Sequence, residues 1–280
     1  MIRSVGGSAG VDQTARNAAA AAQDTADSIL RPTFTEVWPV STDLRAAGDT
    51  SLDGTTCGWV SRITSIGAGA PSVYEIDSNG KYHATYPAST ATGSGNLKTI
   101  DDGEKGPEIV AVWHDTYLPS SGYVEIETVL TLDSGESNQV STSNAIVAGL
   151  ILRLIPLLPT QRGTTGVHNV QVVVSFATGA VNVYLKNTVS GNTSNTITVS
   201  APGYNLVTGV KLKLRISALG TVTMYSAEVG SAYALASGNI KLRNFKIGQW
   251  GVFSANNSAT TGAGGPMNIR LTPPTLTRVP

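Results

Sequence analysis

The sequence predicts an all-β protein, an antiparallel β-sandwich preceded by one short N-terminal α-helix. Two observations predict the sandwich. From Thr33 onward, apolar and polar residues alternate with a period of two, and turn-forming residues separate the alternating segments. A third observation predicts the helix, because residues 11–30 contain no glycine or proline and are rich in alanine. The chain therefore divides into a flexible segment with a helix at 1–32 and a sandwich at 33–280.

The predicted helix carries a stripe of small apolar residues spaced four or three positions apart, which places them on one face. They are Val11, Ala15, Ala18, Ala22, Ala26 and Ile29. Arg31-Pro32 ends the helix, because proline cannot continue it. An alanine stripe lets helices approach closely, so two interpretations remain. The helix packs on the chain's own sandwich, or identical helices form a short bundle about a symmetry axis. We expect the bundle, as an oligomerisation helix of a homotrimer.

The alternation is clearest in the segments 124–132, 170–176 and 210–216. In the last of these, apolar side chains alternate with basic ones, which is typical of a half-buried strand. Turn sequences separate such segments, namely Asn79-Gly80, Asp133-Ser134-Gly135, Ser190-Gly191-Asn192 and Leu219-Gly220. This spacing predicts about a dozen strands and no second helix, as expected for an antiparallel sandwich.

The composition excludes some classes of function. Lys and Arg number 19 and Asp and Glu number 19, so the formal net charge is zero. Nucleic-acid binding requires a surplus of basic side chains to displace counterions, so we expect no nucleic-acid partner. Charged residues make up only 14% of the chain, well below the usual share of about a quarter. Hydroxyls, amides and glycine must therefore cover much of the surface, as is common in β-rich extracellular and virion proteins.

We expect neither an export signal nor a membrane span. Residues 1–10 contain one arginine and no apolar run, which does not fit a secretory signal. The most apolar stretch, 145–158, contains Arg153 and Pro156 and is too short to span a bilayer. The single cysteine, Cys57, cannot form an intrachain disulfide, so the fold does not depend on an oxidising compartment. We expect the protein to fold in a cytosol and to leave it by another route, such as lysis.

Several segments, taken in order, resemble the concanavalin A-like (laminin G-like) jelly rolls. They are 122–132, 148–154, 170–185, 210–229, 248–253 (GQWGVF) and 268–271, within a region of about 35–275. The N-terminal VDQTARNAAAAAQDTADSI is similar to helices that precede such domains in minor tail proteins of actinobacterial phages. The resemblance implies a jelly-roll subunit of the virion, in the phage tail, assembled in the host cytoplasm with other phage structural proteins. It also implies that the sandwich contacts host-surface glycan.

Glu125 and Glu127 lie in the segment VEIET, and two chemical readings of it exist. Legume lectins carry a similar acidic strand that binds metal ions, and glycoside hydrolases on the same fold carry paired catalytic carboxylates. The fourth and fifth residues after Glu125 are Val129 and Leu130, so the second catalytic carboxylate is missing. The following residues also do not supply the oxygen ligands that a hard cation needs. We therefore expect two solvated glutamates on the outer face of a strand, with no catalytic residue.

The remaining polar motifs indicate no cofactor or metal site. His83, His114 and His168 are not at metal-ligand spacing, and none forms a familiar nucleophile motif with Cys57. We expect these histidines to have a structural role or to lie on the surface. The sequence Asp77-Ser78-Asn79-Gly80 is similar to the start of a calcium loop, but the twelfth position is Ser89 instead of glutamate. A hairpin turn explains it better.

Aromatic side chains are the remaining candidates for contacts with sugars. Tyr123, Tyr204 and Tyr233 lie near turns and are possible glycan contacts, whereas Trp59, Trp113 and Trp250 lie in apolar strands and should pack in the core. The prediction is therefore a non-enzymatic structural and receptor-binding subunit of a phage tail. Three alternatives remain: a head decoration or head-fibre protein, a stand-alone carbohydrate-binding lectin, and a polysaccharide depolymerase.

Overall fold

A computed structural model describes fifteen parts of the chain. They are residues 33–35, 37–45, 48–52, 55, 58–63, 71–86, 108–111, 121–133, 146–153, 169–177, 180–187, 196–200, 204–241, 249–256 and 267–279. Within these ranges the chain forms eighteen β-strands and no helix. The helix predicted at 11–30 lies outside the described residues, as do His114, His168, Cys57 and Trp113.

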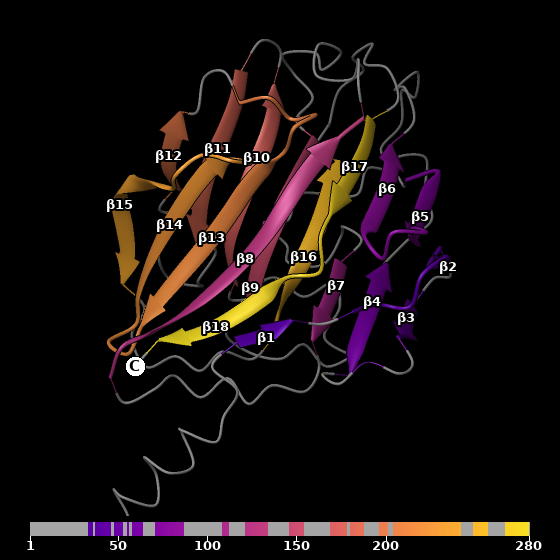
Figure 1. Cartoon of the computed structure of the whole chain (residues 1–280), viewed down its shortest axis with the longest axis horizontal. Helices are drawn as coiled ribbons and strands as arrows, with labels where there is room; N and C mark the ends of the chain where they lie inside the picture. Colours follow the sequence, from indigo (N-terminus) through magenta and orange to yellow (C-terminus); the bar gives the residue numbers. More distant parts are fainter. Residues whose placement is uncertain are drawn as a thin grey trace, which may run out of the picture.

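Ten strands form the first sheet, called sheet A here, in the order β15-β14-β13-β8-β17-β6-β5-β2, with β18 paired to both β8 and β1 (Figure 1). Their bounds are β1 Thr33–Thr35, β2 Thr42–Asp43, β5 Val73–Ile76, β6 Tyr82–Tyr86, β8 Tyr123–Leu132, β13 Val210–Ser217, β14 Thr221–Glu228, β15 Ala234–Lys241, β17 Met267–Leu271 and β18 Thr275–Val279.

Eight strands form the second sheet, sheet B, in the order β12-β11-β10-β9-β16-β7-β4-β3. Their bounds are β3 Gly48–Ser51, β4 Trp59–Ile63, β7 Glu108–Ala111, β9 Ile146–Arg153, β10 Asn169–Ala177, β11 Ala180–Asn187, β12 Thr196–Ser200 and β16 Gln249–Asn256.

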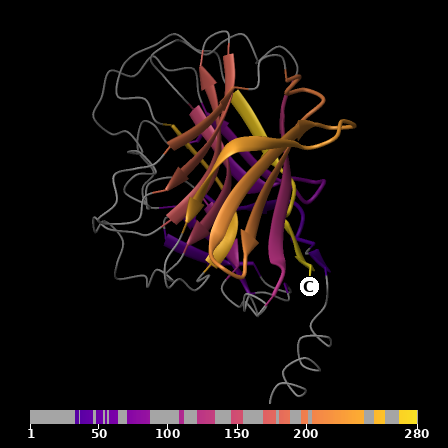
Figure 2. The same ribbon diagram turned by 90° about the vertical axis from the view of Figure 1, so that its left-hand side faces the viewer.

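The chain passes repeatedly between the two sheets, and the strand pairs are antiparallel. Figure 2 shows the sheets edge-on as two layers. The predicted all-β antiparallel sandwich is therefore confirmed. There are more strands than the dozen expected, because strands such as β2, with two residues, and β3, with four, are too short to show an alternation.

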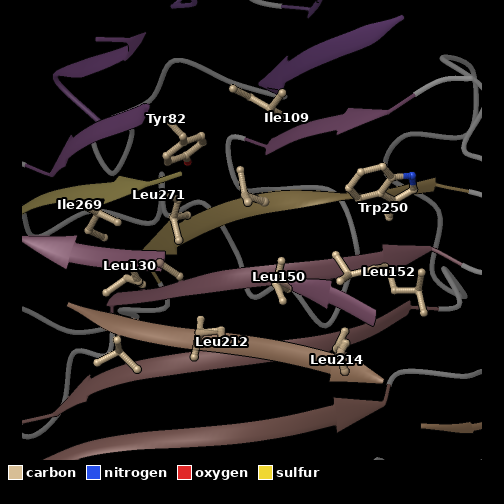
Figure 3. Packing of buried hydrophobic residues seen from close by; sticks show 14 of the residues in the cluster. Tyr82, Ile109, Leu130, Leu150, Leu152, Leu212, Leu214, Trp250, Ile269 and Leu271 are labelled. Carbon is tan, nitrogen blue, oxygen red and sulfur yellow. The ribbon is translucent and has the colours of Figure 1, made fainter. Parts of the chain in front are cut away.

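The core lies between the sheets and is built by the inward residues of each alternating strand. Leu212 and Leu214 of β13 face the interior with Leu150 and Leu152 of β9, and all four are fully buried (Figure 3). Burying a side chain of this size contributes about 1.5–3 kcal/mol. The period-two pattern therefore determines which face of each strand points inward.

Three tryptophans form a chain of rings within this core. The rings of Trp38 and Trp59 are 5.3 Å apart and those of Trp59 and Trp250 are 5.0 Å apart, all in edge-to-face geometry. Each ring is at most 1% exposed. The core positions predicted for Trp59 and Trp250 are thus confirmed. Edge-to-face pairs add about 0.5–1.5 kcal/mol to the energy of burial.

β17 and β18 follow one another along one edge of β8, and two prolines separate them. β17 and β18 both pair with the same edge of β8, at 130–132 and 123–127 respectively. Pro273 and Pro274 lie between them and cannot donate to the ladder, which is typical of a bulge. The Thr272 side chain accepts from Val129 N at 3.0 Å, so it takes over one of the ladder's bonds.

The turn between β5 and β6 confirms the hairpin predicted from Asn79-Gly80. Gly80 has a φ of 73° and its N–H donates to the Asp77 carbonyl at 3.0 Å. Asp77 Oδ1 accepts from the N–H groups of Asn79 (2.8 Å) and Lys81 (3.0 Å). Asp77 therefore stabilises the turn through its side chain, as is common for aspartate at the first position of a turn.

Candidate binding surface

The register of β8 and β13 places acidic and basic side chains opposite each other on the outer face of sheet A. Glu125 pairs with Arg215 and Glu127 pairs with Lys213. The intervening residues of both strands are buried in the core, so these four side chains point away from it. Opposite charges directly across an antiparallel pair stabilise the pairing of the two strands.

The four side chains form a connected ion-pair network. Lys213 Nζ lies 2.9 Å from Glu125 Oε2 and 2.5 Å from Glu127 Oε1. Arg215 Nε donates to Glu125 Oε1 at 2.8 Å. The Glu125 side chain is only 10% exposed. The expectation of two solvated glutamates is therefore wrong for Glu125, because the basic residues of β13 lie across from it and cover it.

This network keeps the Glu125 carboxyl ionised. Burial acts to raise its pKa, but the hydrogen bonds from Lys213 and Arg215, with their positive charges, outweigh burial and lower the pKa below its usual range. Burial likewise acts to lower the pKa of Lys213, and its hydrogen bonds to Glu127 and Glu125 reverse that effect. The pairing therefore favours the charged form of each partner.

Aromatic rings lie against the same cations. The Arg215 guanidinium is 4.1 Å from the ring centre of Tyr123 and 4.8 Å from that of Tyr225. The ammonium groups of Lys211 and Lys213 are each 4.5 Å from the ring centre of Tyr233. Such cation–ring contacts contribute about 0.5–2 kcal/mol, more where water is excluded.

Tyr233 is tied to the network by its hydroxyl as well as its ring. Its Oη donates to Glu127 Oε2 at 3.3 Å, and its ring lies 6.5 Å from that of Tyr225 in edge-to-face geometry. Burial raises the pKa of Tyr233, and the nearby Glu127 carboxylate raises it further, so its phenol stays protonated. We call this set the tyrosine–cation surface; its members are Tyr123, Glu125, Glu127, Lys211, Lys213, Arg215, Tyr225 and Tyr233.

The structure brings together two of the three tyrosines predicted to contact glycan. Tyr123 and Tyr233 both belong to the tyrosine–cation surface. Tyr204 lies apart from them, packed against the core, and its Oη is 3.1 Å from Oγ of the buried Ser226. The difference arises because proximity to a turn does not determine which way a ring points.

Sequence reasoning missed Lys211, Arg215 and Tyr225 as possible contacts. The alternation of basic residues at 211–215 was visible, but their neighbours depend on the pairing of β13 with β8 and β14. β8 and β13 are separated by about eighty residues of chain, and a pairing at that distance has no local signature. The opposite charges of 125–127 and 211–215 were the available signal.

A second polar cluster lies on the outer face of β5, β6 and β17. Glu75 Oε1 is 2.9 Å from His83 Nδ1, and Thr85 Oγ1 is 3.2 Å from His83 Nε2. This order of acid, imidazole and hydroxyl is also found in hydrolytic triads. Here the Thr85 hydroxyl donates to Asn268 Oδ1 at 2.5 Å, so its proton is directed away from the imidazole. The contacts link three neighbouring strands.

The described ranges contain neither a cluster of metal-binding side chains nor a membrane-spanning helix. Within them, no three His, Cys, Asp or Glu side chains are grouped so that they could hold a metal ion. The same ranges contain no helix with the length and apolar character needed to cross a membrane.

Comparisons with known proteins gave similarity at the level of structure only. No protein-family model matches the chain, and no curated protein matches its sequence. Similar solved structures include botulinum neurotoxin type C, in a study of cell entry through two ganglioside molecules, with 9% identity and a TM-score of 0.43 over 90% of this chain and 49% of that one. The binding domain of botulinum neurotoxin DC in complex with rat synaptotagmin II has 10% identity and a TM-score of 0.42, over 88% and 48%.

A third similar structure is the Bacteroides ovatus xyloglucan PUL protein GH43B, with 11% identity and a TM-score of 0.44 over 86% of this chain and 40% of that one. The chain thus spans about half the length of the structures it matches, or less. Similarity at this level assigns no function to the chain.

Proposed function

We propose that the chain is a non-enzymatic virion subunit, of a phage tail, whose tyrosine–cation surface binds host-surface glycan. The observation that carries the binding role is the set of three tyrosine rings held by three cations on the outer face of one sheet. Rings fixed before a ligand arrives lose little conformational freedom on binding, so less of the interaction energy is spent on ordering them.

The chemistry of this surface suits a polar ring-shaped ligand. Tyrosine offers an apolar face for the C–H groups of a sugar and a hydroxyl for its oxygens. The basic side chains add hydrogen-bond donors for the oxygens of a sugar. Tyr233 and Arg215 combine these properties within one small area, because both contact Tyr225.

The same contacts support a non-enzymatic role. A glycoside hydrolase needs one carboxylic acid with a raised pKa to protonate the leaving group and a second carboxylate close to it. Glu125 has a lowered pKa and is held by Lys213 and Arg215. Glu127 is held by Lys213 and Tyr233. Both glutamates of VEIET are therefore engaged by neighbouring side chains, which disfavours the depolymerase alternative.

The virion context rests on the sequence. Its supports are the resemblance of 122–132 and 210–229 to concanavalin A-like jelly rolls, the resemblance of the alanine-rich segment to helices of phage minor tail proteins, and the balanced charge. Those features are shared by head-fibre proteins, so only a position on the particle distinguishes the two. A stand-alone lectin would bind glycan but would be absent from particles.

The test has two arms on the full chain. Gold-labelled antibody raised against the purified protein is applied to intact phage particles and viewed by electron microscopy, and labelled protein is applied to an array of neutral and acidic glycans. We expect label on the tail and binding to at least one glycan. Label on the head would favour the decoration-protein alternative, glycan binding without any label would favour the lectin, and sugar release from the array would favour the depolymerase.

A further inference from the structure

The tyrosine–cation surface carries one cation that lacks a carboxylate partner. Lys213 and Arg215 are both paired with glutamates. Lys211, on the same face of the same strand, forms no ion pair in the part of the chain that the structure describes; its Nζ donates to the Ser231 carbonyl at 2.7 Å. Three cations and two carboxylates therefore leave one positive charge in excess, located at Lys211.

The Lys211 ammonium lies beside an aromatic ring, and apolar side chains surround the base of the Lys211 side chain. Its ammonium is 4.5 Å from the ring centre of Tyr233. Its cross-strand neighbours are Val129 of β8 and Ala227 of β14. Two positions away, Gly209 has no side chain, and a Cβ there would lie 3.2 Å from both Val129 Cγ1 and Val229 Cγ2. The absence of a side chain lets these two valines converge next to the lysine.

We propose that Lys211 and Tyr233 form a subsite for the carboxylate of an acidic sugar, such as a uronic or sialic acid. This inference rests on the proposed glycan binding and names its class of ligand. An ammonium has three donors, and one of those of Lys211 is used by Ser231. The other two can meet a carboxylate while the sugar ring lies on Tyr233 and the valines. A neutral sugar would leave the excess charge without a partner.

The charged groups described on the far side of β8 are engaged with one another. There Arg270 pairs with both Asp77 and Asp133, and Glu75 contacts His83. A ligand carboxylate is attracted to the excess charge of Lys211, so it should enter over β13 and β14. The attraction between exposed charges weakens with salt, so binding should also weaken as ionic strength rises.

The test uses three carboxylated probes: oligogalacturonate, an oligosaccharide with glucuronate, and oligosialic acid, each compared with its methyl ester. The ester keeps the ring and hydroxyls and removes only the charge. Binding to the full chain is measured by calorimetry. We expect at least one acid form to bind about tenfold or more tightly than its ester, the gain of a charge-assisted hydrogen bond.

The matched variants are Lys211→Met, which keeps most of the stem, and Lys241→Met, which removes an exposed lysine at the far end of β15. We expect the first to abolish the preference for the acid and the second to leave it intact. Equal binding of acid and ester would overturn the inference while leaving glycan binding in place. An acid preference that survives in Lys211→Met would overturn the assignment to this residue. Failure of every probe, acid and ester, would overturn the inference and count against the glycan-binding function.

Discussion

Replacing Glu125 by glutamine tests whether the ion-pair network on sheet A stabilises the fold. The substitution keeps the shape of the side chain but removes the charge shared by Lys213 and Arg215. Lys213 keeps Glu127 as a partner, with Nζ–Oε1 at 2.5 Å. Arg215 keeps its contacts with Tyr123 and Tyr225 but loses the carboxylate that holds it. The substitution therefore removes only the Glu125 charge from a partly buried ion-pair network.

The magnitude lies between two known limits. Breaking a fully buried ion pair costs about 3–5 kcal/mol, whereas losing an exposed pair costs about 0–1 kcal/mol. The side chains of Glu125 and Lys213 are 10% and 13% exposed, but that of Arg215 is 34% exposed and can recover water. We expect Glu125→Gln to lower the free energy of unfolding by about 2 kcal/mol, between these limits.

Urea unfolding followed by circular dichroism measures this loss. With a slope of about 3 kcal/mol per molar, the midpoint should fall by about 0.7 M at unchanged slope. The control is Glu228→Gln, because Glu228 lies at the end of β14 and accepts only an exposed backbone hydrogen bond, from Asn205 N at 3.3 Å, among its described contacts. We expect that control to shift stability by less than about 0.5 kcal/mol. Equal losses of stability in both variants would show that the ion-pair network does not stabilise the fold.

Three further predictions concern strain, pH and assembly. Gly209→Ala should lower the free energy of unfolding by about 3 kcal/mol, because φ is +109° and the new Cβ would lie 2.9 Å from Thr131 Cγ2. The control Gly230→Ala, with φ +91° and open space around the new Cβ, should lower it by only about 1 kcal/mol. Equal urea midpoints for the two variants would contradict this prediction. Because the pKa of Glu125 is lowered in the folded state, its contribution to stability is present above the ordinary pKa of 4.5 and is lost as pH falls below that value. The free energy of unfolding of Glu125→Gln should therefore depend less on pH in the acid range than that of the wild type. Parallel pH curves for the two proteins would contradict this prediction. Deleting residues 1–31 should reduce the number of subunits measured by light scattering from the full chain's expected three. An unchanged number of subunits would contradict the trimerising role of that segment.

The fold could be predicted from the sequence because its signal is local. The alternation at 210–216 identifies both a strand and its inward face, and each inward residue proved buried. The tryptophans Trp59 and Trp250 were placed in the core for the same reason, since their neighbours are apolar. An alternation with a period of two can be recognised only over several residues, so the sequence does not predict short strands such as β2.

The candidate surface could be predicted only in part, because it depends on contacts distant in sequence. The motif around Glu125 lacks the further carboxylate and oxygen ligands of a chemical site, so the sequence predicts a solvated side chain. The residues that cover Glu125 come from β13, by register. Tyr204 and Tyr233 both precede or follow turns, yet one packs on the core and the other on two lysines. The orientation of such rings is decided by tertiary packing, which the local pattern does not encode.

The role of the tyrosine–cation surface in glycan binding is tested on the full chain with Tyr233→Ala, using Tyr204→Phe as the tyrosine control. We expect the wild-type chain to bind at least one glycan on an array of neutral and acidic sugars. Tyr233→Ala should bind that glycan about tenfold more weakly, from the loss of ring stacking and one hydroxyl contact. Tyr204→Phe should bind unchanged, because its hydroxyl contacts the buried Ser226 away from the surface. A wild-type chain that binds no glycan, or equal binding by all three proteins, would contradict the claim.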